Sequence, residues 1–443
     1  MTTEITQLAS VFAAATLLAM VAKRWRQPLV IAYVLTGLIL SQTGWLSSTL
    51  APLWQLFSDI GIALLLFLVG LEIDYASLRK VGPAALIIGL GQVVFTFGAG
   101  FILTLLLGLE PLSAGYIAIA LTFSSTVIVV KLLSEKNDMN SLYGKMALGI
   151  LLVQDVVAVG MLIVIGAPGT DGQLLWPILV ALTKGVVLFS ITFWLGRQVM
   201  PKLFDYFARS RELLWLASIA WLFVMAAVAD ALGLSIAAGG FMAGLALANS
   251  AEHFQIAGRI RPLRDFFIAI FFIFLGTTVS VTGMHVIAWP TVVLSVFVLI
   301  GNPFIVLMIM QSMGYHHRTG FLTGLSIAQI SEFSFILAAL GASTGHLEPS
   351  VVTLITSVGL ITIIVSSSLI VHSQAIYQRL HPWLHRWLGA SGISSLGKAK
   401  RLNRPVVVIG AHRTGQSIMR YLNPSDMLVI DFDPDIVSDL KRR

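Results

Sequence analysis

Long apolar stretches separated by short polar segments run through the chain from its first residues to position 372. Because about twenty apolar residues in a helix cross the hydrocarbon core of a bilayer, each stretch predicts a transmembrane helix. The pattern predicts thirteen spans, and hence an all-α polytopic membrane protein. These spans lie at residues 6–22, 28–45, 53–70, 83–108, 112–133, 144–167, 174–200, 212–231, 235–249, 264–281, 286–312, 319–341 and 350–372.

Composition agrees with this pattern: 57% of the 443 residues are hydrophobic, only 11% are charged, and the mean hydropathy is +0.90. Soluble domains carry about 25% charged residues, so an integral membrane protein is expected. Cysteine is absent, which excludes disulfides, thiolate metal sites and cysteine nucleophiles. Neither a nucleophile motif nor a histidine pair with metal-ligand spacing stands out, so we expect no enzyme and no metal site.

Lysine and arginine alternate sharply between successive loops. Sixteen of them lie at or beside the loops that follow odd-numbered spans, whereas the loops between, such as 46–52 and 342–349, contain none. The positive-inside rule then predicts an N-terminus outside and a C-terminus in the cytoplasm. The membrane itself is expected to be a prokaryotic inner membrane. The net charge of +7 therefore reflects topology, and no nucleic-acid partner is expected.

Two spans carry polar residues at their centres. The fifth contains Thr122, Ser124, Ser125 and Thr126, and the twelfth contains Gln329, Ser331 and Glu332. Because the two are seven spans apart they run in opposite directions, as in an inverted repeat of spans 1–6 and 8–13 around span 7. Helices broken at these points would direct helix-end dipoles into a cavity and stabilise an ion there. Alternatively, the hydroxyls bond to carbonyls one turn back in unbroken helices.

A carboxylate paired with an amide, Gln154-Asp155, lies in the middle of the apolar stretch Ala147–Ile165. The bilayer core is a poor solvent for an ionised acid, so such a residue usually faces a polar cavity and handles an ion or a proton. The alternative is a neutral, protonated aspartic acid that is hydrogen-bonded within the bundle. The paired interruptions in the fifth and twelfth spans favour transport.

After His372 the composition changes. Residues 373–404 form a polar, basic linker with an amphipathic start at Tyr377–Leu388, and residues 405–443 predict a β-α-β segment. Its strands are expected at 405–409 and 427–431, and its helix at 415–422. The segment is short for a closed α/β domain, so we expect an incomplete Rossmann-like domain.

Nucleotide-binding features accompany that segment. Gly410 and Gly415 flank the turn, and Asp431 follows Gly410 by 21 residues, as in sites where an acid binds ribose hydroxyls. His412 occupies the place of the middle glycine, and Arg413 beside it could attract a phosphate. A regulatory nucleotide (AMP, NAD(H) or ATP) is therefore expected here, with impaired binding, and transport itself is expected to need no cofactor.

Several motifs resemble Kef-type potassium/proton antiporters, which share a superfamily with the sodium/proton antiporters. They are LLLFLVGLEID (64–74), LTFSSTVIVVKLL (121–133), LLVQDVVAV (151–159) and QISEFSFIL (329–337), followed by the start of an RCK/KTN nucleotide-binding domain. The resemblance implies a homodimer with a scaffold of spans 1–3 and 8–10. It also implies a core of spans 4–6 and 11–13 that slides across the membrane, with the fifth and twelfth spans crossing as broken helices.

The same resemblance implies how the ion is bound. Asp155 would hold either a dehydrated cation or a proton, and their competition would couple the two fluxes. Gln154 would orient Asp155 or bond to a broken helix, while the polar residues 122–126 would add oxygen ligands or neutralise helix ends. Gln329, Ser331 and Glu332 are expected to support the core.

One departure from the Kef pattern affects the expected stoichiometry. Asn302 stands where Kef proteins commonly carry a lysine, so no intramembrane cation balances Asp155, and electroneutral one-for-one exchange is the simplest expectation. Potassium is favoured over sodium by the resemblance and by Gln154. The alternative function is an RCK-regulated cation channel without proton coupling, although no TVGYG filter sequence occurs.

Overall fold

The structure, a computed structural model, forms two compact units, Met1–Gly389 and Ala390–Arg443. It describes residues 2–25, 27–43, 51–72, 83–136, 138–139, 141–165, 175–248, 250–279, 284–388, 405–411, 413–424, 426–431 and 440. His412 and positions 389–404 of the expected linker lie outside these residues. Each unit is described by itself.

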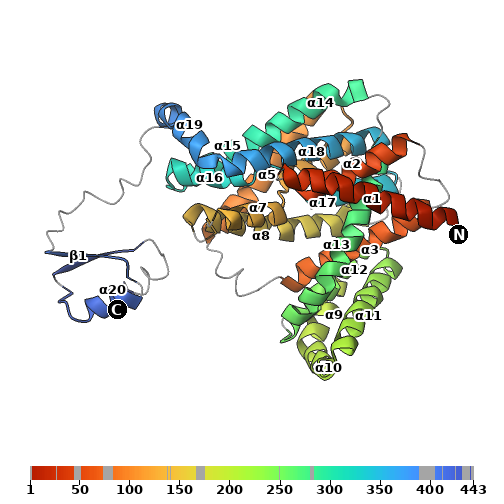
Figure 1. The fold of residues 1–443 in the computed structure, drawn as a ribbon, viewed down its shortest axis with the longest axis horizontal. Coiled ribbons are helices and arrows are strands. Elements are labelled where there is room, and N and C mark those ends of the chain that lie inside the picture. Colours follow the sequence, from red (N-terminus) through yellow and green to blue (C-terminus); the bar gives the residue numbers. More distant parts are fainter. Residues whose placement is uncertain are drawn as a thin grey trace. The chain divides into compact units, whose positions relative to one another are not determined.

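Helices make up nearly all of the described part of the first unit (Figure 1). Those before the middle of the chain are α1 (Thr2–Arg24), α2 (Leu29–Gln42), α3 (Ala51–Glu72), α5 (Pro83–Leu106), α6 (Pro111–Thr122), α7 (Thr126–Glu135), α8 (Leu142–Ile165), α9 (Leu175–Gln198) and α10 (Met200–Phe207). The later ones are α11 (Arg211–Ala231), α12 (Ile236–Leu247), α13 (His253–Thr278), α14 (Met284–Val296), the π-helix η2 (Phe297–Gly301), α15 (Asn302–Ser312), α16 (His317–Ser326), α17 (Glu332–Ser343), α18 (Pro349–Val371) and α19 (Ser373–Leu388).

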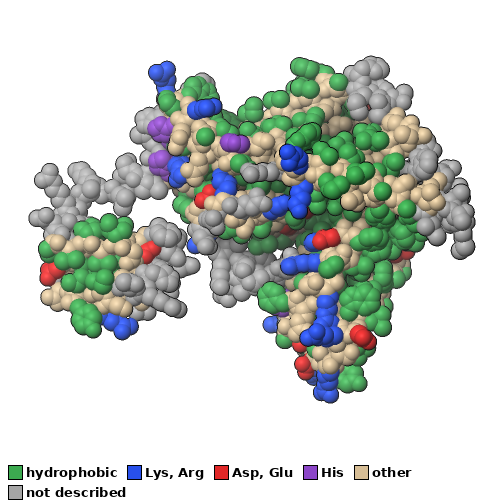
Figure 2. Space-filling model, viewed as in Figure 1, with side chains coloured by type: hydrophobic (Ala, Val, Ile, Leu, Met, Phe, Trp, Pro, Cys, Tyr) green, Lys and Arg blue, Asp and Glu red, His purple; other side chains and the backbone are tan. Residues whose placement is uncertain are grey.

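Each predicted span coincides with one helix or with consecutive helices. By length and apolar composition, eight helical segments among the described residues could cross a membrane, and α2, α12 and α17 are shorter apolar helices. The total of thirteen spans therefore stays a prediction. Hydrophobic side chains cover much of the visible face of this unit, as expected of a surface in contact with lipid (Figure 2).

Both polar interruptions are breaks between helices. In the fifth predicted span, α6 ends at Thr122 and α7 begins at Thr126, and the backbone between them is extended at Phe123 and Ser125. The second separates α16 from α17 between residues 326 and 332. Serine side chains cap both restarts, because a serine hydroxyl accepts a hydrogen bond from the otherwise unpaired backbone N–H groups of a first turn.

Two groups of helices pack within the first unit. In one, α3, α12 and α13 pack together, with α2 against α13. Glycines allow this close approach, since a Cβ at Gly240 would lie 2.6 Å from the carbonyl oxygen of Ala63, and one at Gly244 would meet the carbonyl oxygen of Phe67. In the other group, α5 packs on α6, α8 and α15, while α17 packs on α6 and α18. The scaffold and core boundaries remain predictions.

A π-helix interrupts the long apolar segment before Asn302. η2 covers Phe297–Gly301, and Asn302 begins α15 directly after it. A π-turn holds one residue more than an α-turn and so rotates the positions that follow it. Asn302 is fully buried at this point.

The start of the expected linker is helical. In α19, Tyr377 and Leu384 pack against Leu307 of α15, and the Tyr377 ring lies 5.6 Å from that of Phe321 in α16. This helix therefore belongs to the first unit and contacts one half of the second broken span.

The second unit contains a parallel pair of strands, β1 (Val406–Ile409) and β2 (Met427–Ile430), connected through α20 (Arg413–Met419). Val406 pairs with Met427 and Ile409 with Ile430. Gly410 has φ +90°, a conformation that glycine adopts without strain, and a Cβ at Gly415 would meet the carbonyl oxygen of Gly410. The Asp431 carboxylate accepts a hydrogen bond from the Ala411 N–H at 2.5 Å, so it holds the turn.

Candidate ion-binding site

Asp155 lies half-buried on α8, opposite the first break. The hydroxyl of Thr126, the first residue of α7, donates a hydrogen bond to Asp155 Oδ2 at 2.9 Å. The N-terminal end of a helix carries partial positive charge from its unpaired N–H groups, which stabilises a nearby carboxylate. The break thus supplies both a hydroxyl and a helix end to the one carboxylate in the middle of α8.

Gln154, the neighbour of Asp155, is fully buried and contacts the same break. Its Oε1 accepts a hydrogen bond from the Ser124 N–H at 3.0 Å, and its Nε2 donates to Gln92 Oε1 at 2.6 Å. Two consecutive residues of α8 therefore hold two nearby residues of the broken span. This contact is the bond to a broken helix that we expected of Gln154 from the sequence.

Three polar side chains from α5 and α15 gather at the C-terminal end of α6. Gln92 Nε2 donates to the Thr122 carbonyl at 3.2 Å and to Thr96 Oγ1 at 3.0 Å. Thr96 donates to Asn302 Oδ1 at 3.0 Å, and Asn302 Nδ2 donates to the Leu121 carbonyl at 3.1 Å. Amide N–H groups therefore stabilise the partially negative end of α6.

Sequence reasoning missed Gln92 and Thr96. Both lie in the predicted span 83–108, four residues apart and hence on one helix face. That spacing was the available signal, but isolated polar residues in an apolar helix commonly bond only within their own helix.

Two of the other candidate hydroxyls of the first break, those of Thr122 and Ser125, act locally. Thr122 donates to the Ile119 carbonyl of its own helix at 2.7 Å, as the alternative interpretation expected. Ser125 Oγ accepts from the Ile128 N–H at 3.4 Å and caps α7. Thr126 is thus the member of this set that bonds to Asp155.

The second break is held mainly by α18. Gln329 Oε1 accepts a hydrogen bond from Ser366 at 2.6 Å, and the Ile330 N–H donates to Thr362 Oγ1 at 3.4 Å. Ser331 caps α17 by accepting from the Phe333 N–H at 3.2 Å. Gln329 and Ser331 therefore support this break and make no hydrogen bond to Asp155.

The two breaks contact each other directly. Ser124 Oγ donates to the Ile327 carbonyl at 2.8 Å, and Ser334 Oγ donates to the Ala120 carbonyl at 2.6 Å. Each break thus sends a hydroxyl to the C-terminal end of the opposite half-helix. The resemblance to Kef-type antiporters implied that the two broken spans cross; these hydrogen bonds show that the spans are in contact, and the crossing stays a prediction.

Glu332, at the start of α17, lines a cavity of about 380 Å³. Ser125 and Lys131 also line it, as do Arg264 and Asp265 of α13. Lys131 and Arg264 lie beside loops that the charge pattern places in the cytoplasm. This cavity therefore corresponds to the predicted cytoplasmic side.

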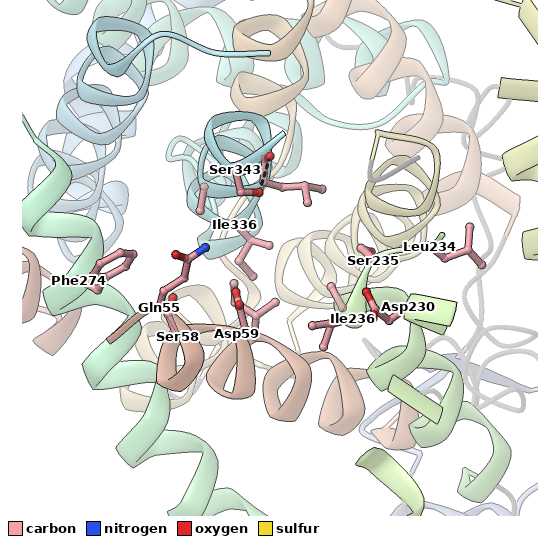
Figure 3. Close-up of a pocket in the computed structure, with 14 residues that line it drawn as sticks. Gln55, Ser58, Asp59, Asp230, Leu234, Ser235, Ile236, Phe274, Ile336 and Ser343 are labelled. Carbon is pink, nitrogen blue, oxygen red and sulfur yellow. Dashed lines mark hydrogen bonds between the residues drawn. The ribbon is translucent and has the colours of Figure 1, made fainter. Parts of the chain in front are cut away.

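A second cavity of about 280 Å³ contains Asp59 of α3 and Asp230 of α11 among its lining residues (Figure 3). Ser235 and Ser343 line it too. The loops beside Asp230 and Ser343 contain no lysine or arginine, which is the pattern predicted for the outside. Asp59 and Asp230, far apart in the sequence, thus share one cavity.

Comparison with known proteins places most of the first unit in one family. The profile described as sodium/hydrogen exchanger, transmembrane, matches residues 11–372. A solved structure of the sodium proton antiporter MjNhaP1 from Methanocaldococcus jannaschii superposes with a TM-score of 0.65 and 14% identity, covering 83% of this chain and 98% of that one. That likeness shows the fold.

Three curated relatives are similar in sequence. K(+) efflux antiporter 6 of Arabidopsis thaliana is 31% identical over 353 residues, or 76% of this chain and 58% of that protein. The glutathione-regulated potassium-efflux system protein KefC of Escherichia coli is 26% identical over 422 residues, or 93% and 66%. The iron transporter MagA of Paramagnetospirillum magneticum is 26% identical over 364 residues, or 82% and 84%.

The alignments with the two potassium-efflux proteins thus span less than two thirds of each. The family profile, in contrast, matches residues 11–372, which contain both breaks, most of the first predicted span and all of the later ones. The chain therefore belongs to the sodium/hydrogen exchanger family, and its resemblance to Kef-type cation/proton antiporters is confirmed.

Proposed function

We propose that this chain exchanges a monovalent cation for a proton across the membrane, with potassium preferred over sodium, and that Asp155 binds both in turn. The observation that carries this proposal is the hydrogen bond of 2.9 Å between Thr126, at a broken helix, and Asp155 within an apolar helix. Hydroxyl and carboxylate oxygens are the ligands that alkali cations use. The preference for potassium rests on the Kef-type relatives and on Gln154 beside Asp155.

Competition at one carboxylate is sufficient to couple the fluxes. When Asp155 is ionised, its negative charge is unfavourable in the low-dielectric interior unless a cation accompanies it. When it is protonated, it is neutral and can change its exposure between the two sides without a cation. A bare carboxylate is disfavoured in transit, so each crossing carries either a cation or a proton.

The charge carried per cycle follows from the groups around Asp155. Asn302, Gln92 and Gln154 are neutral amides, so none of these three buried groups compensates the charge of the ionised aspartate. A site with one titratable carboxylate exchanges one proton for one monovalent cation, which is electroneutral. We therefore propose one-for-one exchange.

The two cavities support alternating access by a sliding core. The cavity of about 380 Å³, on the predicted cytoplasmic side, lies between Tyr33 and Asp265 on one side and Ser125 and Glu332 on the other. The cavity of about 280 Å³, on the predicted outer side, likewise lies between Asp59 of α3 on one side and Ser343 of α17 on the other. Both cavities thus lie between the predicted scaffold (spans 1–3 and 8–10) and the predicted core (spans 4–6 and 11–13), as a core sliding along a scaffold requires.

Further parts of the proposal concern the assembly. We place thirteen spans in an inner membrane, with the N-terminus outside, and the protein as a homodimer in which the broken spans cross. The β1–α20–β2 unit has the order of a Rossmann-type, RCK-like nucleotide site. There Gly410 and Gly415 supply the turn, while the Asp431 carboxylate is engaged by the backbone of that turn.

Proton flux in proteoliposomes tests the proposal. Purified protein is reconstituted with an internal pH dye, the membrane potential is clamped, and K⁺ or Na⁺ is added outside. We expect proton efflux driven by K⁺ more strongly than by Na⁺, and its loss in Asp155→Asn with unchanged reconstitution. Cation permeation without linked proton movement would contradict antiport and indicate a channel.

A further inference from the structure

The hydrogen bonds around the first break form a closed ring. The ring runs from the Ser124 N–H through Gln154, Gln92, Thr96 and Asn302, and it returns to the broken span at the carbonyls of Thr122 and Leu121. We propose that Gln92 and Thr96 are positioning residues that hold this extended segment, and so Thr126, in the geometry that binds the cation at Asp155. This inference rests on the proposed function and assigns part of its specificity to α5.

Burial makes the ring a strong constraint. Gln92, Thr96, Gln154 and Asn302 are all 0% exposed. An unpaired polar group at such a depth costs more free energy than a hydrogen bond contributes, because water cannot replace the missing partner. Any movement of residues 122–124 away from this geometry would break bonds to several helices at once. The ring therefore resists displacement of the break.

The orientation of each amide follows from the backbone at the two ends of the ring. The Ser124 N–H is a donor, so Gln154 must present its oxygen to it and its nitrogen to Gln92. Gln92 then presents its own oxygen to Gln154 and its nitrogen to the Thr122 carbonyl, which can only accept. Neither of these two side-chain amides can flip without losing the hydrogen bonds of both its oxygen and its nitrogen.

None of the side chains in the ring titrates in the physiological range. Its hydrogen bonds therefore need not change when Asp155 exchanges a cation for a proton. A neutral ring can thus hold the binding geometry in both forms of the carrier. Lost positioning should then weaken cation binding more than it slows the maximal exchange rate, because the binding geometry is what the ring preserves.

Thr96 offers a matched test on its own helix. Thr104 is also 0% exposed and lies two turns further along α5, but its hydroxyl donates only to the Gly100 carbonyl of that helix, at 2.6 Å. Thr96→Val removes a bond between helices, whereas Thr104→Val removes a bond within one. Thr96→Ser keeps the hydroxyl and should restore the ring.

The readout is the cation concentration that gives half-maximal exchange in proteoliposomes. We expect Thr96→Val to raise it about tenfold, while the maximal rate stays within about twofold. Thr96→Ser and Thr104→Val should both stay within about twofold of the unaltered protein. Equal values for Thr96→Val and Thr104→Val would overturn the positioning role, as would failure of the serine variant to restore binding.

A second measurement separates this inference from the proposed function. The rise in thermal unfolding midpoint caused by K⁺ in detergent reports binding without transport. Thr96→Val should need about ten times more K⁺ for the same rise, and Thr104→Val should not. If the unaltered protein shows this rise but no proton exchange, antiport is wrong while the ring is still tested. A K⁺ response unchanged by Thr96→Val would overturn the ring.

Discussion

Thr126 and Asp155 come from separate helices, yet the threonine hydroxyl lies 2.9 Å from the carboxylate and begins the half-helix α7. The pair therefore joins a hydrogen-bond donor, a helix N-terminus and a titratable group at one point. Removing the hydroxyl while keeping the shape of the side chain tests its share of cation binding.

We expect Thr126→Val to lower cation-driven exchange at subsaturating cation by about tenfold, since one hydrogen bond to a charged group contributes about 1.5–3 kcal/mol. Thr126→Ser should retain most of the activity. The measurement is the initial rate of proton efflux from proteoliposomes. Full activity in the valine variant would show that Asp155 works without this hydroxyl.

The bond from Ser334 to the Ala120 carbonyl should stabilise the fold, because it joins the two broken spans in a fully buried place. Ser334→Ala leaves that carbonyl without its partner, so we expect a loss of about 1–3 kcal/mol in unfolding free energy. Ser343, on the same helix, is exposed and donates only to the Leu340 carbonyl at 2.9 Å. Thermal unfolding in detergent should show a lower midpoint for Ser334→Ala and little change for Ser343→Ala.

Close packing of α3 against α12 should fail when Gly240 gains a methyl group. A Cβ there would lie 2.6 Å from the Ala63 carbonyl oxygen, and backbone cannot move aside as a side chain can. We expect Gly240→Ala to cost about 1–3 kcal/mol. At Gly98 a Cβ would meet nothing within 4 Å, so Gly98→Ala should leave stability equal or higher. A stable Gly240→Ala protein in a denaturation assay would contradict this packing.

Acidification should loosen α19 from α16. Burial lowers the pKa of His316 below its ordinary value of 6.5, and the positive charge of His317, His381 and Arg318 lowers it further. Release of α19 would take the charge of His381 away from His316 and so raise the pKa of His316, and the released form therefore binds more protons. The contact is therefore most stable above about pH 6.5 and weakens as the pH falls below that value.

Cysteine accessibility measures this release without background, because the chain has no cysteine of its own. Leu384 is 6% exposed and packs on Leu307, whereas Leu380 on the same helix is 39% exposed. We expect the ratio of maleimide labelling at Leu384→Cys to that at Leu380→Cys to rise as the pH falls. Adding His316→Gln should flatten the rise; an equal rise in that background would assign it to another group.

The positions of both breaks could be predicted from sequence, because clusters of hydroxyl and amide side chains interrupt otherwise apolar spans. Asp155 could be singled out for a similar reason, as a carboxylate in the middle of such a span. The start of α17 at Glu332 agrees with the expected break. Residue type and spacing were sufficient for these features, since each depends on local polarity against an apolar background.

Gln92 and Thr96 could not be found in that way. Thr96 and Thr104 are both buried threonines on the same face of α5, and sequence periodicity gives them the same description. They differ only in the acceptor of the hydroxyl's hydrogen bond, which is Asn302 Oδ1 for Thr96 and the Gly100 carbonyl of the same helix for Thr104. That difference depends on how α15 packs against α5, which is a property of tertiary structure and not of the pattern along either helix.

The π-helix before Asn302 has a consequence for comparing relatives. The turn at Phe297–Gly301 takes up one residue more than an α-turn, so a relative with a plain α-turn and one residue fewer here would still present its equivalent of Asn302 towards the broken span. Winding all five residues as an α-helix would instead bring Gly301 to that point and withdraw the Asn302 amide from the ring, with the composition of the helix unchanged. Alignments that place a gap elsewhere in this apolar segment would assign the wrong residue to the position that faces the broken helix.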